Sequence, residues 1–274
     1  MTRSLSSRLA VLGEDFDFED DLFSISEIYH ENTKLHCFSP QEQVDLSSPT
    51  AIAAMMNART VFRDVPKISL RRVAIPDQGV FKTLRCRRSF RAFAPSRVTF
   101  EQLAILLEAS NGITARIKTL DEQTLNLRAS PSAGALYPTE TFLAVQSVAG
   151  LPPGLYHHNP TNQELAILGR ENLNEELRDL CLNQPIVDAA AAILLLTCNI
   201  KRVRQKYGER GYRYGLLDMG HLMQSLWLAA TELDLGFITL GGFKDDAALE
   251  LLPIDGVDNI LGYVALIGTR ETVL

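Results

Sequence analysis

The feature that most constrains this chain is a long segment, about residues 214–235, whose apolar side chains cover more than one face of a helix. Leucine and alanine recur there at helical spacing, and methionine and tryptophan widen the face: Leu217, Leu222, Leu226, Ala229, Ala230 and Leu233, with Met219, Met223 and Trp227. A helix that is apolar on several sides is stable only when it is covered on several sides. We therefore expect a central helix here.

Several shorter patterns predict the elements that cover it. Thr99 is expected to cap a helix that Gly112 ends, with Gln102 in the capping-box position. Apolar runs bounded by polar residues at 141–145 and 192–196 predict strands in the middle of a sheet.

A hairpin and a final strand complete this pattern. Residues 154–158 are expected to enter a hairpin that turns through 159–162, and a last strand is expected over 260–268. The sequence shows no internal repeat and no low-complexity tract. We predict one α+β domain over residues 81–274, preceded by an N-terminal arm with short helices over residues 1–80.

Charge and cysteine usage exclude several classes of function. The chain has 27 Lys and Arg against 33 Asp and Glu, a formal net charge of -6, which argues against a nucleic-acid partner. Its cysteines show neither metal-ligand nor C-x-x-C spacing, so we expect reduced thiols, no metal and no disulfide: Cys37, Cys86, Cys181 and Cys198. No signal-peptide core or membrane-spanning run is present, so we expect a cytoplasmic protein without a membrane partner.

Common nucleotide and metal motifs do not occur in the sequence. It contains no G-x-G-x-x-G after a strand, no G-x-x-x-x-G-K-[ST] and no H-E-x-x-H. A Rossmann dehydrogenase, a P-loop NTPase and a zincin are therefore disfavoured.

An arginine cluster is the first positive signal for a ligand. Three guanidinium groups and a hydroxyl fall within five residues of an otherwise acidic chain, at Arg87, Arg88, Ser89 and Arg91. Such a set can hold a phosphate with paired hydrogen bonds. The alternative is a basic turn that is merely solvated.

Two runs of small residues are the next signals. Pro131, Ser132, Ala133 and Gly134 form a small-residue turn before a strand, where backbone can approach a flat ligand closely. Gly241-Gly242 can present backbone N–H groups to an electron-rich ring atom. A tight loop and a plain turn are the respective alternatives.

Taken in order, these residues resemble the nitroreductase superfamily, and more closely its SagB/ThcOx-type branch of flavin dehydrogenases, which oxidise azoline rings in modified peptides. The resemblance covers about residues 81–270. It rests on the strings Arg87-Arg88-Ser89-Phe90-Arg91, Pro131-Ser132-Ala133-Gly134-Ala135-Leu136-Tyr137-Pro138 with Glu140, Gly154-Leu155-Tyr156, Lys206-Tyr207-Gly208-Glu209-Arg210-Gly211-Tyr212-Arg213-Tyr214 and Asp218-Met219-Gly220-His221.

The resemblance implies a fold, a cofactor and residues that hold it. The fold would be nitroreductase-like, with a mostly antiparallel central sheet, flanking helices and a two-fold homodimer in which the long apolar helix is a candidate contact. The cofactor would be FMN. Its phosphate and ribityl chain would lie on the arginine cluster and Arg270, its ring on the small-residue turn, and its N5 atom beside Gly241 and Gly242.

Lys206 and Tyr207 match a Lys-Tyr pair to which the azoline-oxidising branch assigns proton transfer. A lysine acts as a base only when its charged form is disfavoured, and nearby Arg202, Arg204 and Arg210 could have that effect. Tyr207 could orient or share the proton. The alternative is an ordinary exposed lysine in a basic loop.

We therefore expect an FMN-dependent dehydrogenase or oxidase that converts thiazoline or oxazoline to thiazole or oxazole in a modified peptide, with a cyclodehydratase complex as a partner. One alternative is an NAD(P)H-dependent reductase of nitro compounds or quinones that acts on a small-molecule substrate. Another is a scaffold subunit of a peptide-modifying complex. We expect His221, on the apolar helix, to be a hydrogen-bonded core residue and not a catalytic one.

Overall fold

The computed structural model describes residues 64–69, 79–95, 97–118, 122, 124–169 and 172–271. All of them belong to one compact unit, Pro40–Leu274. Most of the expected arm at residues 1–80 lies outside the described residues. The described residues before position 81 include a short strand, β1 (Lys67–Ser69), which pairs with the central sheet.

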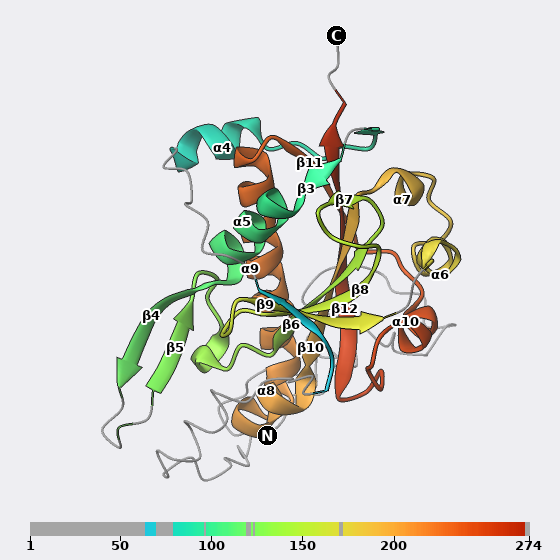
Figure 1. The fold of residues 1–274 in the computed structure, drawn as a ribbon. Coiled ribbons are helices and arrows are strands. Elements are labelled where there is room, and N and C mark those ends of the chain that lie inside the picture. Colours follow the sequence, from blue (N-terminus) through green and yellow to red (C-terminus); the bar gives the residue numbers. More distant parts are fainter. Residues whose placement is uncertain are drawn as a thin grey trace, which may run out of the picture. The chain divides into compact units, whose positions relative to one another are not determined.

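The described part of the chain is built on an eight-stranded antiparallel sheet (Figure 1). Its strands follow the order β1-β9-β8-β6-β10-β12-β11, and β2 pairs with β12. The strands not yet given are β2 (Phe93–Ala94), β6 (Thr139–Val145), β8 (Gly154–Asn159), β9 (Glu164–Gly169), β10 (Ala192–Asn199), β11 (Leu235–Leu240) and β12 (Asn259–Arg270). An α+β fold with an antiparallel central sheet, as predicted, is confirmed.

The long helix α9 (Arg210–Glu232) packs on one face of this sheet together with α5 (Phe100–Asn111). It begins four residues before the expected start and ends three before the expected end. At its start, Gly211 lies against α8 (Ile200–Tyr207) so closely that a Cβ would meet the Val203 carbonyl carbon at 2.8 Å. At its end, Asp234 adopts a left-handed conformation and Leu235 opens β11, which pairs with β12.

Short helices cover the opposite face of the sheet (Figure 1). They are α6 (Asn174–Leu180), α7 (Ile186–Ala189) and α10 (Asp245–Leu251). Their buried leucines and alanines pack with Phe142, Ile193 and Leu195 of the central strands. Because β6 and β10 are covered on both sides, nearly every residue in them is buried.

The predicted helix start and hairpin are confirmed in detail. Thr99 Oγ1 accepts a hydrogen bond from Gln102 N at 3.1 Å, and Gln102 Oε1 accepts one from Thr99 N at 3.0 Å, a complete capping box at the start of α5. Strands β8 and β9 form the expected hairpin around residues 160–163. Asn159 Oδ1 accepts from Thr161 N at 3.1 Å in its turn.

A second hairpin was not predicted. Strands β4 (Ile113–Lys118) and β5 (Thr124–Arg128) form a separate two-stranded sheet that joins α5 to the small-residue turn. Both strands alternate apolar and polar residues, with Ile113, Ala115 and Ile117 in β4 and Leu125 and Leu127 in β5, a strand pattern that our sequence analysis did not use. Most side chains of β4 are nevertheless exposed. The parallel pair β3 (Val98–Thr99) and β7 (Val148–Ala149), the 3₁₀ helix η1 (Ala133–Ala135) and the helix α4 (Val80–Cys86) complete the described elements.

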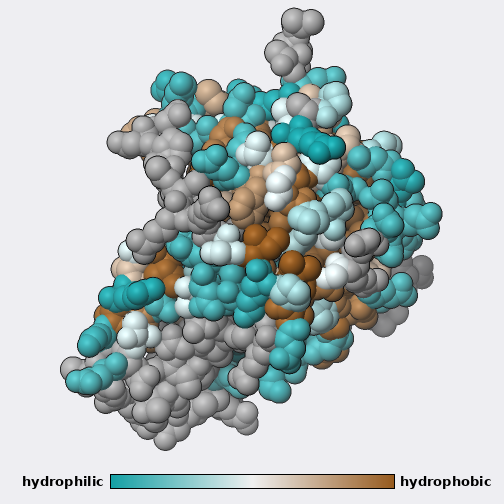
Figure 2. All heavy atoms as spheres, viewed as in Figure 1, coloured by the Kyte–Doolittle hydropathy of each residue, from teal (hydrophilic) through white to brown (hydrophobic). Residues whose placement is uncertain are grey.

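Hydrophilic residues dominate the face seen in Figure 2, and apolar side chains show near its middle.

On α9, the side chains of Leu216 and Leu217 are 40% and 58% exposed. Among the described helices, none combines the length and apolar character needed to cross a bilayer.

Candidate functional site

The small-residue turn and the Lys206-Tyr207 pair lie together, although 72 residues separate Gly134 from Lys206 in the chain. Gly134 has a left-handed backbone, with φ of +60°. A Cβ built on it would lie 2.5 Å from Lys206 Nζ and would also overlap Tyr207 Oη. The ends of both side chains therefore lie directly against Gly134, where any larger residue would displace them.

Helix α8 (Ile200–Tyr207) carries this pair in its last turn. Its start is capped by Asn199, whose side chain accepts from Arg202 N at 2.8 Å. Lys206 Nζ lies 5.4 Å from the centroid of the Tyr207 ring. Tyr207 packs edge-on against Tyr214 of α9, with ring centroids 4.9 Å apart.

The environment of Tyr207 favours its protonated form. Burial raises the pKa of the phenol above its usual value of 10.0, and the neighbouring Tyr214 and Asp218 raise it further. Tyr207 therefore stays neutral at physiological pH. It can donate a hydrogen bond but is not suited to accept a proton first.

Asp218 contacts the small-residue turn, although the sequence analysis named it only within a string that carries the resemblance and not as a candidate site residue. Its carboxylate accepts a hydrogen bond from Ser132 Oγ at 2.5 Å and from Ala133 N at 3.1 Å. Burial raises the pKa of Asp218, while these two hydrogen bonds act in the opposite direction. The sequence feature that could have identified it is an acidic residue on the apolar face of a helix, where burying an unpaired carboxylate would cost free energy.

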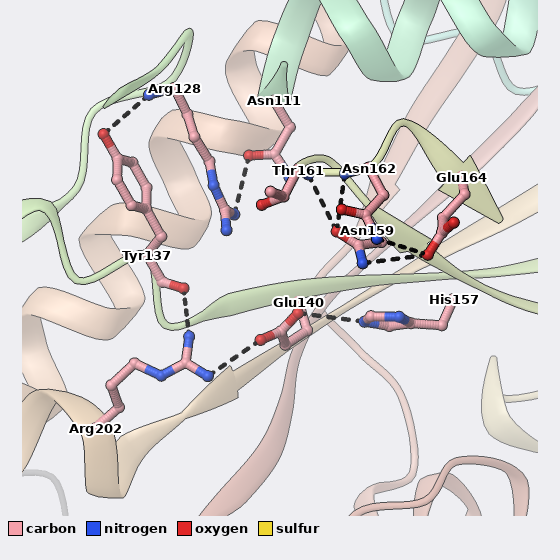
Figure 3. A network of polar contacts seen from close by, with 10 residues as sticks. All are labelled: Asn111, Arg128, Tyr137, Glu140, His157, Asn159, Thr161, Asn162, Glu164 and Arg202. Carbon is pink, nitrogen blue, oxygen red and sulfur yellow. Dashed lines mark hydrogen bonds and ion pairs between the residues drawn. The ribbon is translucent and has the colours of Figure 1, made fainter. Parts of the chain in front are cut away.

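A buried ionic network holds α8 to the sheet (Figure 3). Arg202 Nη2 lies 3.3 Å from Glu140 Oε1, and its Nη1 donates to the Tyr137 carbonyl at 2.8 Å. His157 Nε2 lies 3.2 Å from Glu140 Oε2. Although burial alone would raise the pKa of Glu140, the hydrogen bond with His157 and the charge of Arg202 hold it below its usual value.

This network changes our expectation about the arginines near Lys206. Arg202 is engaged by Glu140, and Arg204 is paired with Glu209. Their charges are therefore largely balanced by carboxylates. The structure therefore does not support our expectation that Arg202 and Arg204 disfavour the charged form of Lys206.

A small cavity lies beside the small-residue turn. Arg128 stacks on the Tyr137 ring at 4.7 Å and approaches Asn111 Oδ1 at 3.5 Å (Figure 3). The cavity is lined by Asn111, Arg128, Ser130, Pro131, Ser132, Tyr137, Pro138, Thr139, Asp218 and Leu222. Thr139 Oγ1 is buried there without a hydrogen-bond partner among the described residues.

The arginine cluster lies at the other end of α9, between α4 and β2. The Arg87 guanidinium stacks on Trp227 at 4.5 Å, and Arg88 Nη1 donates to the Arg85 and Arg87 carbonyls at 2.8 and 2.7 Å. Arg270, on β12, stacks on Phe90 at 4.7 Å. Ser89 and Arg91 flank Phe90.

Strand pairing places Arg270 beside the cluster, because Arg270 of β12 lies opposite Phe93 of β2 in the sheet. Its Nη1 forms an ion pair with Asp234. Its Nε is buried and lacks a partner among the described residues.

The predicted residues do not all meet at one point in a single chain. Trp227, beside the cluster, is nine residues from Asp218, beside the turn, which is about 13 Å along a helix axis. Gly241 and Gly242 follow the far end of β11, whereas Leu235 at its start pairs with Thr269 next to Arg270. Both glycines are exposed, and a Cβ on Gly241 would meet nothing within 4 Å.

His221 differs from our expectation, because it is exposed on α9 and does not lie in the core. It neighbours Asp218, whose pKa it lowers. It lies beside the buried stripe of α9, on the solvent-facing side of the helix.

Comparison with known proteins defines the family. The nitroreductase family model matches residues 84–269. A protein of Methanocaldococcus jannaschii named as a nitroreductase, MJ1384, is 34% identical over 168 residues, covering 61% of this chain and 81% of that protein. A crystal structure from Anabaena variabilis, described as a nitroreductase, superposes with a TM-score of 0.67 at 31% identity.

That superposition covers 89% of this chain but only 47% of the Anabaena chain. The microcin B17-processing protein McbC of Escherichia coli is 29% identical over 133 residues, covering 47% of this chain and 49% of McbC. The chain therefore spans about half the length of these two proteins. The family match and the antiparallel α+β fold agree that this chain belongs to the nitroreductase family and is an oxidoreductase.

Proposed function

We propose that this protein is an FMN-dependent dehydrogenase that oxidises thiazoline or oxazoline rings of a modified peptide to thiazole or oxazole. The observation that carries the proposal is the convergence of Lys206 Nζ and Tyr207 Oη on Gly134. A reductase that only passes electrons to a nitro compound or quinone has no need of a protein base. The partial similarity to a microcin B17-processing protein also favours a peptide substrate.

The residues present fit FMN by the chemistry of their donor groups. The arginine cluster, with Arg88, Ser89 and Arg91, would hold the phosphate and ribityl chain together with Arg270, whose buried Nε lacks a partner among the described residues. The small-residue turn, from Pro131 to Gly134, offers close backbone contact where a Cβ would fill the space. The exposed amides of Gly241 and Gly242 would be donors to the ring.

Oxidation of an azoline removes two hydrogens from adjacent ring atoms, one as a proton and one as a hydride, and leaves a double bond between those atoms. Lys206 Nζ takes the proton in this proposal. The chemistry that bound FMN supplies is acceptance of the hydride, with dioxygen as the final acceptor of the two electrons, which gives hydrogen peroxide.

Tyr207 has a different task from Lys206. Because burial, Tyr214 and Asp218 raise its pKa, the phenol keeps its proton. We therefore assign Tyr207 to orienting the substrate ring by hydrogen bonding and Lys206 to removing the proton.

We also propose that the protein is a homodimer. Leu216 and Leu217 leave apolar surface on the exposed side of α9, and the arginine cluster and the small-residue turn are separated along that helix. A second copy packed on α9 would cover the leucines. Sedimentation that finds a monomer at micromolar concentration with flavin bound would contradict this.

The decisive experiment compares Lys206→Ala with Lys201→Ala. Both residues lie on α8, but Lys201 is 66% exposed and lies 3.7 Å from Asp258, away from the turn. The purified protein is loaded with FMN and incubated in air with a thiazoline-bearing peptide, and mass spectrometry measures the loss of two hydrogens. We expect the wild type and Lys201→Ala to oxidise the peptide and Lys206→Ala to fail.

The main alternative is an NAD(P)H-dependent reductase of nitro compounds or quinones, favoured by the names of two relatives. Under that alternative, wild type and Lys206→Ala would reduce a nitroarene with NADPH equally well, and the thiazoline would stay unchanged. A protein that fails to bind FMN would contradict both functions. Co-purification with a cyclodehydratase tests the expected partner.

A further inference from the structure

Asp218 is a buried carboxylate on the apolar side of α9. It is 5% exposed, and Gly215, Met219 and Leu222 around it on the helix are also buried. Taking a carboxylate out of water costs free energy unless hydrogen bonds compensate. Its presence therefore indicates a specific set of partners.

Those partners belong to a single turn. Ser132 Oγ and Ala133 N both donate to Asp218, and Ser132 Oγ in turn accepts from Tyr137 N at 2.9 Å. Through one serine, the carboxylate is tied to both ends of the segment 132–137. The whole segment is thereby fixed to α9.

The backbone of this segment needs such fixing. Gly134, Ala135 and Tyr137 all have positive φ, at 60°, 54° and 46°. The left-handed conformation is unfavourable for alanine and tyrosine and persists only where surrounding contacts impose it. Asp218 and Ser132 supply these contacts.

The fixed segment meets the Lys206-Tyr207 pair at Gly134. Asp218 is also near the pair along α9. Tyr214, one helical turn before Asp218, packs on the Tyr207 ring. We propose that Asp218 is a positioning residue for the Lys206-Tyr207 pair, because it holds the turn in place under the two side chains. This inference rests on the proposed function.

The charges around the pair are consistent with that role. Tyr207 faces Lys206 on α8 and Tyr214 and Asp218 on α9, and the Asp218 charge contributes to its raised pKa. Asp218 itself faces His221 on α9, Cys198 on β10 and Ser132 in the turn. Replacing the carboxylate by an amide of the same shape should therefore lower the pKa of Tyr207.

The test uses the full-length protein with three variants, Asp218→Asn, Ser132→Ala and the control Asp188→Asn. Asp188 is an exposed carboxylate paired with Arg178, outside the site. The titration of Tyr207 is read from ultraviolet tyrosinate absorbance, as the difference between each variant and the same variant carrying Tyr207→Phe. This reading needs neither FMN nor substrate.

We expect Asp218→Asn to shift the Tyr207 titration to lower pH and to reduce kcat for the thiazoline peptide by about 10-fold or more, with little change in KM. Ser132→Ala, which keeps the charge, should reduce kcat without lowering the Tyr207 titration. Asp188→Asn should match the wild type in both readings.

An unchanged Tyr207 titration in folded Asp218→Asn, or an unchanged kcat, would overturn the inference while leaving the Lys206 requirement intact. If the wild type does not oxidise the thiazoline, the proposed function fails. In that case, a Tyr207 titration that moves to lower pH in Asp218→Asn still shows that Asp218 acts on the pair. An unchanged titration overturns the positioning role of Asp218 as well. If Asp218→Asn does not fold, Ser132→Ala decides through kcat.

Discussion

Replacing Gly134 by alanine should separate the stability of the turn from the placement of the functional pair. The glycine has φ of +60°, where alanine is strained by roughly 1 kcal/mol. The new Cβ would also lie 2.5 Å from Lys206 Nζ, whereas ordinary contacts begin near 3.4 Å. The Lys206 Nζ atom must therefore retreat by about 1 Å, a displacement that can cost about 100-fold in rate.

Gly169 provides the matched control. It also has a positive φ, of +77°, but a Cβ there would meet nothing within 4 Å. It ends β9, whereas Gly134 precedes β6. Gly169→Ala should therefore carry a similar backbone strain without touching the pair.

The assay measures urea unfolding and thiazoline oxidation for both variants. We expect each to lose about 1 kcal/mol of unfolding free energy, and only Gly134→Ala to lose about 100-fold in kcat. Full activity in Gly134→Ala would refute the reasoning, because the predicted overlap would then have no effect on catalysis. An equal loss of kcat in Gly169→Ala would also refute the reasoning, because general destabilisation would then explain the effect.

Three further predictions concern stability, cofactor binding and assembly. Burial lowers the pKa of His158 from 6.5 to about 3, so the unfolded chain binds a proton first as pH falls. Urea unfolding should show about 2 kcal/mol less stability at pH 5 than at pH 7, a dependence that His158→Leu loses and His221→Gln keeps. Arg91→Gln should weaken FMN binding about 10-fold, measured by fluorescence titration, whereas Arg116→Gln on the β4–β5 hairpin should not. Leu217→Asp should turn the proposed homodimer into a monomer in sedimentation, and an unchanged dimer would place the contact elsewhere.

Local signals in the sequence predicted much of the fold. The capping box of Thr99 and Gln102 needs only neighbouring residues, and the apolar runs of β6 and β10 are continuous because both strands are covered on both faces. The β4–β5 hairpin was not predicted, although both of its strands alternate apolar and polar residues. In β4 this alternation does not mark a face buried in the core, because most of its side chains are exposed.

The residues of the candidate site could be named from the sequence, but the contacts between them could not. Lys206, Tyr207 and Gly134 could be named from the sequence, yet their meeting depends on α8 crossing the turn. The engagement of Arg202 by Glu140, 62 residues away in the chain, is a tertiary contact that no local pattern reveals. Whether the arginine cluster and Gly241-Gly242 hold FMN stays a prediction.

The Arg202–Glu140 pair has a consequence for the motion of α8. An eight-residue helix is only marginally stable alone in water, and the side of α8 that carries Lys201 and Arg204 is solvated. Its opposite side is fastened to β6 through a guanidinium that also binds the Tyr137 carbonyl. The amide protons of α8 should therefore exchange with solvent nearly as slowly as those of the central strands, so that the lysine stays in register with Gly134 until the sheet itself opens.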